Sequence, residues 1–193
     1  MKKILALWLL LLSVPAFAQT LKVNLLSLTG ADARDEDRIH RALDIITEVV
    51  NSEAFRAEIL NMKYKIGNKE FSGYTQTTLT PKQILDKILD GTENFSGGQK
   101  NSIDLFLDMY YQRSSTVGYT SVNDKYLHMN RRFHANYTPE ETAGNIFHEW
   151  LHKIGFDHSQ KNNSERPHSV PYKLGYLLAG FTGTNHLINC DHE

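Results

Sequence analysis

Residues 148–158 restrict this chain more than any other segment: they read HEWLHKIGFDH, which fits the pattern H-E-x-x-H-x-x-G-x-x-H. Two residues four apart on a helix lie on one face, so His148 and His152 can direct their imidazoles at one ion. Gly155 stands where such a helix would end, because glycine accepts the left-handed conformation that closes many helices. The chain can then turn back and bring His158 to the same ion.

This spacing also predicts the role of the ion. Three protein ligands leave a fourth position for water, which is the arrangement of catalytic zinc sites. Glu149 lies about 100° round the helix from His148, so its carboxylate can reach the water without binding the ion. The motif therefore predicts His148, His152 and His158 as zinc ligands and Glu149 as the general base of a hydrolytic reaction. Zinc suits three imidazoles and water well, although the spacing does not exclude another divalent metal.

The residues before the motif predict a helix that can carry it. Thr138 is a candidate N-cap, Pro139 suits the first helical position, and Glu141 completes a capping box. The apolar residues that follow have helical spacing and form one stripe opposite the metal-binding side: Ala143, Ile146, Phe147, Trp150 and Ile154.

The motif resembles the zinc-binding signature of the metzincin clan of metallopeptidases, strictly over residues 148–158 and more loosely elsewhere. The resemblance implies an α+β fold, in which a twisted mixed sheet is backed by a long helix and the zinc helix, with a small C-terminal subdomain. It also implies cleavage of protein or peptide substrates. Metzincins carry a methionine turn beneath the metal, and this chain has no methionine after His158.

The nearest counterpart of that turn is residues 168–172, similar to the Ser-Val-Met-His-Tyr turn of astacin-like enzymes. Val170 would then replace the methionine, and Pro171 would help to form the turn. By the same resemblance, Tyr172 matches a tyrosine that stabilises the transition state in astacins and serralysins. A plain packing role for Tyr172 is equally compatible with the sequence. The departure at Val170 leaves the chain outside any named metzincin family.

The amino-terminal residues 1–18 fit a secretory signal peptide. Lys2 and Lys3 form a positive start, residues 4–14 are apolar, and residues 16–18 read A-F-A, as at a cleavage site. The apolar run is too short for an ordinary membrane span, and no cysteine follows the cleavage site to receive a lipid. We therefore expect one catalytic domain over residues 19–193, exported to the periplasm or the medium of a bacterium.

Charge and cysteine content limit the partners. The net charge of −1 is close to neutral and gives no support for nucleic-acid binding. Cys190 is the single cysteine, so no intramolecular disulfide can form, and its role stays open. Nothing in the sequence indicates an oligomer, so a monomer is the default.

The pattern along the chain predicts alternating elements and an α+β fold. The expected strands cover residues 21–28, 62–74, 103–111, 116–121 and 125–133, and the expected helices cover 35–60, 81–89 and the end of 171–181. Residues 103–111 are nearly all apolar and should form a central strand. Residues 116–121 are a candidate rim strand that an extended substrate could join.

These observations favour a secreted zinc endopeptidase. A second hypothesis is a catalytically weak or inactive zinc-stabilised binding protein on the same fold, which the missing methionine motivates. Hydrolysis of a non-peptide amide is a third, with nothing beyond export in its support.

Overall fold

The computed structural model describes residues 19–62, 79–93, 101–158 and 166–181, which form an α+β fold with a small mixed sheet and six α-helices. The expected signal peptide, most of the expected strand at 62–74, and Cys190 lie outside these residues.

The sheet has four strands in the order β1-β2-β4-β3. β1 (Lys22–Thr29) and β4 (Leu127–Asn130) both run parallel to β2 (Ser102–Tyr110), and β3 (Gly118–Tyr119) runs antiparallel to β4 at the edge. Alternate residues of β2 are buried on one face: Ile103, Leu105, Leu107 and Met109. The prediction of a mixed sheet with an inner strand near 103–111 is confirmed.

The long helix expected at 35–60 is two helices, α1 (Ala33–Asn51) and α2 (Glu53–Asn61). Ser52 interrupts them with an extended backbone, and its hydroxyl accepts a hydrogen bond from the Phe55 N–H while donating to the Val49 carbonyl. This side chain ends one helix and starts the next. The apolar side chains that follow helical spacing across both helices are nevertheless all buried: Ile39, Leu43, Ile46, Val50, Phe55 and Ile59.

Three further predictions differ in outcome. The helix expected at 81–89 is α3 (Pro81–Asp90); Thr80 caps it, and Gly91 ends it with a positive φ of 65°. The strand expected at 125–133 is wrong in its second half, because Arg131–His134 form a short helix, α4, whose N-cap is Asn130. The expected strand at 116–121 is reduced to the two residues of β3.

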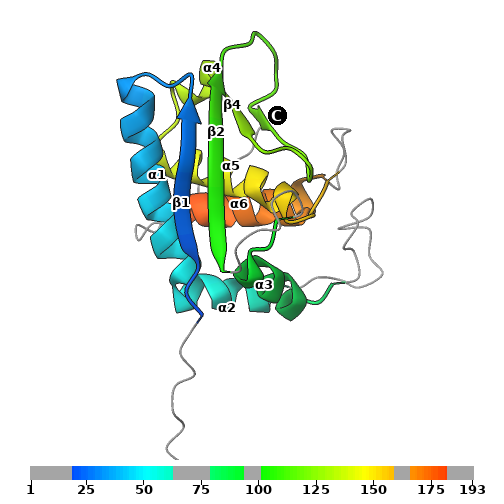
Figure 1. The fold of residues 1–193 in the computed structure, drawn as a ribbon. Helices are drawn as coiled ribbons and strands as arrows, with labels where there is room; N and C mark the ends of the chain where they lie inside the picture. Colours follow the sequence, from blue (N-terminus) through cyan, green and yellow to red (C-terminus); the bar gives the residue numbers. More distant parts are fainter. Residues whose placement is uncertain (1–18, 63–78, 94–100, 159–165, 182–193) are drawn as a thin grey trace, which may run out of the picture.

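Two helices lie behind the sheet in Figure 1, α5 (Pro139–Lys153) and α6 (Val170–Gly180). α5 carries His148, Glu149 and His152, and α6 carries Tyr172. A 3-10 turn, η2 (Arg166–His168), leads into α6. α5 contacts both α1 and α6, and one apolar core includes residues from all three helices and from the inner face of the sheet.

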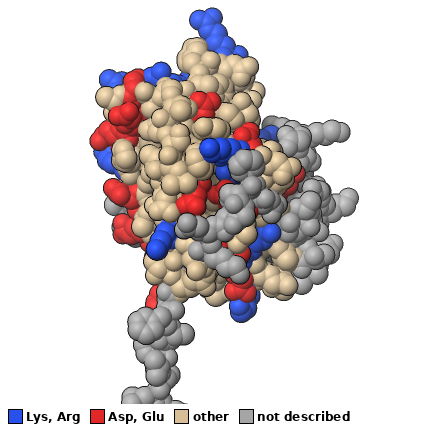
Figure 2. All heavy atoms as spheres, viewed as in Figure 1, with Lys and Arg blue, Asp and Glu red and all other residues tan. Residues whose placement is uncertain are grey.

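The face shown in Figure 2 carries charges of both signs, and acidic side chains lie along its left side, over α1. Basic side chains do not gather into one patch on this face. Among the described residues, no helix is long and apolar enough to cross a membrane.

Candidate metal centre

α5 is the helix that the sequence predicts for the metal-binding motif. Thr138 caps it, Glu141 completes the capping box and Pro139 lies in the first turn. The predicted apolar stripe is fully buried: Ala143, Ile146, Phe147, Trp150 and Ile154 each have 0% exposure. That burial fixes the rotation of the helix, so His148 and His152 lie on one side of it, a turn apart.

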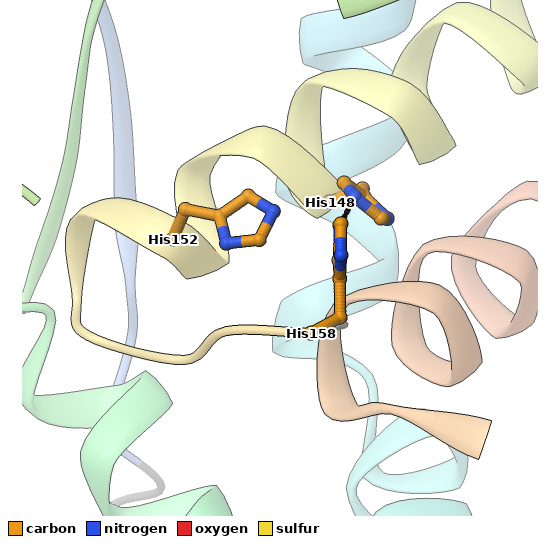
Figure 3. Close-up of side chains that lie close together, drawn as sticks. All are labelled: His148, His152 and His158. Carbon is orange, nitrogen blue, oxygen red and sulfur yellow. Dashed lines mark hydrogen bonds between the residues drawn. The ribbon is translucent and has the colours of Figure 1, made fainter. Parts of the chain in front are cut away.

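The reversal after α5 follows from Gly155, whose φ is 93°. The Phe156 N–H donates to the Leu151 carbonyl at 3.0 Å, and the Gly155 N–H donates to the His152 carbonyl at 2.9 Å. This bond pair is the Schellman pattern, in which a left-handed glycine closes the last turn. The predicted helix stop is therefore confirmed, and the reversed chain returns His158 to the side of α5 that carries the other two histidines (Figure 3).

The three imidazoles lie close enough to hold a metal ion, since one ring nitrogen from each falls within 4.8 Å of the others. The Nε2 atoms of His148 and His158 are 3.3 Å apart (Figure 3). Two nitrogens bound to zinc at about 2.0–2.1 Å in tetrahedral geometry lie about 3.3 Å apart. The spacing of this pair thus fits a tetrahedral ion without rearrangement.

Backbone carbonyls orient two of the rings. Nδ1 of His152 lies 2.8 Å from the Phe156 carbonyl, to which it can donate, leaving Nε2 as the ligand atom. The backbone of Pro171 hydrogen-bonds the His148 ring. Since proline has no N–H, its carbonyl must accept from the imidazole. Such hydrogen bonds behind a ligand fix its tautomer and direction.

Burial keeps these ligands ready for a cation. It lowers the pKa of His148 well below its ordinary value, and the charges of His152, His158 and Arg166 lower it further. Burial also lowers the pKa of His152, and the hydrogen bond that its ring donates to the Phe156 carbonyl opposes this shift. Metal binding requires neutral imidazoles, so no proton has to leave these two rings near neutral pH.

Glu149 is only 4% exposed, and β3 passes directly over it. A Cβ added to Gly118 would lie 3.0 Å from Glu149 Oε1 and 3.1 Å from Asn145 Oδ1, so glycine allows the strand this close. Burial raises the pKa of Glu149 to about 8 in the metal-free chain, and the positive charge of Arg166 opposes the rise. A dication nearby would favour the carboxylate form.

Tyr172, the residue that the metzincin resemblance assigns to the site, lies beside two of the three histidines. Its ring centroid is 4.5 Å from that of His148 and 4.9 Å from that of His158. Val170 and Pro171 are buried, but they belong to the first turn of α6, which Ser169 caps. The segment proposed as a tight turn is therefore a helix start, and its link to the ligands is the Pro171 carbonyl.

A close crossing of α5 and α6 places Tyr172 against His148. A Cβ on Gly144 would lie 2.6 Å from the Gly175 carbonyl oxygen, and a Cβ on Gly175 would lie 3.1 Å from the Cβ of His148. Only glycine at both positions lets the two backbones approach this far.

A buried ion pair, which the sequence did not indicate, anchors the end of α5. Lys153 Nζ lies 3.0 Å from Glu93 Oε2, and the two residues are 1% and 4% exposed. Trp150 Nε1 donates to the other oxygen of Glu93 at 3.1 Å, and Lys153 also donates to the Lys125 carbonyl at 2.8 Å. These bonds tie the turn that follows His152 to the segment after α3 and to the loop before β4.

Arg166 is the other residue of this centre that the sequence did not indicate. Its guanidinium carbon lies 5.1 Å from the centroid of the Tyr172 ring. Arg166 belongs to the polar segment after the motif, so no residue spacing predicts its place in the site. Its positive charge next to the predicted turn is the one sequence feature that could have indicated it.

Comparison with protein-family models, with curated proteins and with solved structures found no match to this chain.

Proposed function

We propose that this chain is a secreted, zinc-dependent endopeptidase of metzincin-like type. The observation that carries the proposal is the convergence of three imidazole nitrogens within 4.8 Å of one another, next to the buried carboxylate of Glu149. Three neutral histidines plus an open position are a zinc ligand set, and a carboxylate beside them is the base that hydrolysis needs. The signal-like residues 1–18 support export from a bacterial cell.

In the proposed reaction, His148, His152 and His158 would hold the zinc. When bound, zinc supplies Lewis acidity, which makes water acidic near neutral pH and polarises a carbonyl. Glu149 accepts the proton of the attacking water and delivers it to the leaving amine. Tyr172 is proposed to help stabilise the oxyanion, since its ring borders His148 and His158.

β3 is proposed to bind the substrate backbone. It is an edge strand of the sheet and it passes over Glu149. An extended peptide that added to this edge by backbone hydrogen bonds would lie beside the base.

The test uses purified, zinc-loaded protein and a diverse peptide library. We expect wild-type protein to cleave peptides in a chelator-sensitive manner. Glu149→Gln should still bind zinc but lower the rate by a factor of about a hundred or more, because the proton acceptor is lost. Equal cleavage by this variant and the wild type would contradict the assigned role of Glu149.

The second candidate is a zinc-stabilised binding protein with weak or no catalysis. Val170 favours it, because this residue stands where metzincins have methionine and it starts a helix. Zinc bound in full stoichiometry without chelator-sensitive cleavage of any library peptide would support this candidate against the peptidase.

A further inference from the structure

Arg166 lies one aromatic ring away from two of the three histidines. Its guanidinium carbon is 5.1 Å from the centroid of Tyr172. The same ring also contacts His148 and His158, at 4.5 and 4.9 Å between centroids. A permanent cation therefore stands beside the metal centre without being one of its ligand groups.

The positive charge of Arg166 lies one ring contact away from the candidate ligands, because the Tyr172 ring contacts both the guanidinium and His148. α6 adds to the positive potential, since Ser169 caps this helix immediately after η2 and a helix N-terminus carries a partial positive charge. Arg166 and the start of α6 are thus two sources of positive potential next to Tyr172.

We infer that Arg166 binds a carboxylate of the substrate and so makes the proposed peptidase select acidic peptides. The inference rests on the proposed function for its link to cleavage. A guanidinium presents paired N–H groups that match a carboxylate in two parallel hydrogen bonds. Contact with the face of Tyr172 is compatible with this role, because the N–H groups point outward in the plane of the guanidinium.

The positive charge of Arg166 disfavours the binding of basic peptides. A lysine or arginine of a peptide would meet the Arg166 cation beside a dication, and like charges at close range suppress binding. The carboxylate could belong to an aspartate or glutamate side chain or to the C-terminus of a peptide. Both sources present the same group to Arg166, so the experiment has to separate them.

The test measures binding apart from turnover. One peptide scaffold carries glutamate, glutamine or lysine at each position in turn, and each peptide is made with a free and an amidated C-terminus. Dissociation constants are measured on zinc-loaded Glu149→Gln protein, and cleavage is measured on wild-type protein. We expect the peptides with the favoured carboxylate to bind about tenfold or more tightly than their neutral counterparts.

Variants of Arg166 provide the decisive comparison. Arg166→Gln should remove the preference for the carboxylate, and Arg166→Lys should keep part of it, because the charge remains while the paired donors are lost. Arg41→Gln is the matched control: Arg41 is an exposed residue of α1 paired with Asp37, and its loss changes the net charge equally. This control should retain the full preference.

The possible outcomes distinguish the two sources of the carboxylate, and they test the role of Arg166 separately from the peptidase proposal. A preference that disappears on amidation assigns the C-terminal carboxylate, and one that survives assigns an acidic side chain. An equal carboxylate preference in Arg166→Gln and wild-type protein, or no preference in the wild type, overturns the inference. Preferential binding without cleavage by wild-type protein instead overturns the peptidase proposal and leaves carboxylate binding by Arg166 in place.

Discussion

His134 is a buried histidine whose surroundings differ from those of the ligand histidines. It is 0% exposed, and its Nε2 lies 3.1 Å from Asn145 Oδ1, to which it can donate. Its Nδ1 is buried and has no hydrogen-bond partner among the residues that the structure describes. Burial lowers the pKa of His134 to about 4, because a charged imidazolium there would lose its hydration.

This shift predicts a loss of stability in acid. The pKa is 6.5 in the unfolded chain and about 4 in the folded one, so between these values the unfolded state binds more protons. The stabilising contribution is thus complete above pH 6.5 and is lost as the pH falls toward 4, up to about 3 kcal/mol. Denaturant unfolding at a series of pH values checks it.

The matched variant for this prediction is His134→Gln, whose side-chain amide can still donate to Asn145 but does not titrate. It should show a weaker fall in the free energy of unfolding over the same pH range. Identical pH profiles for the two proteins would mean that other groups cause the acid sensitivity.

The three candidate ligands could be predicted at the residue scale because the information that places them is local. His148, His152 and His158 are placed by one helix and one glycine turn, and short spacing rules describe both. Arg166 and the pair of Glu93 with Lys153 could not be predicted, because their meaning depends on chain segments that meet only after folding.

At the scale of elements, the helix and strand types were predictable, but their ends were not. Apolar positions keep helical spacing across α1 and α2, so periodicity alone joins them, and only the side-chain hydrogen bonds of Ser52 separate them. Likewise, residues 131–133 suit a strand by composition, yet the Asn130 side chain accepts from the Arg132 N–H and starts a helix. At each boundary, a single polar side chain hydrogen-bonds to the backbone and so determines where one element ends and the next begins.

Because α5 and α6 are in close contact, we predict that one methyl group added between them destabilises the protein. In Gly144→Ala, the new Cβ would lie 2.6 Å from the Gly175 carbonyl oxygen and 2.7 Å from the Ala179 Cβ, so the helices must separate. We expect a loss of about 1–3 kcal/mol in the free energy of unfolding. Zinc affinity should also fall, because α6 carries the Pro171 carbonyl that holds His148.

Gly180→Ala is the control for this change, since a Cβ there meets no atom of the described residues within 4 Å. It should leave zinc affinity unchanged, as measured by competition with a chromogenic chelator. Unchanged zinc affinity in Gly144→Ala would show that α6 does not support the ligand.

At the scale of the whole molecule, the candidate metal centre joins segments that are far apart in sequence. Its three histidines lie on α5 and the turn after it, α6 supports one of them, and Lys153 ties the end of α5 to Glu93 and to the Lys125 carbonyl. The single cysteine allows no disulfide within the chain to replace these links. Binding of an ion at this junction should therefore stabilise the entire fold and not one helix.

We expect zinc to raise the free energy of unfolding by about 2.7 kcal/mol at a hundredfold excess over its dissociation constant, and a chelator to reverse the gain. His158→Ala should abolish most of this gain, because the loop ligand that closes the site is lost. His40→Ala, a change of the same type on the exposed side of α1, should keep all of it. Thermal unfolding of the three proteins with and without zinc measures the effect. Equal stabilisation of His158→Ala and wild-type protein would place the bound zinc elsewhere and would remove the basis of the proposed chemistry.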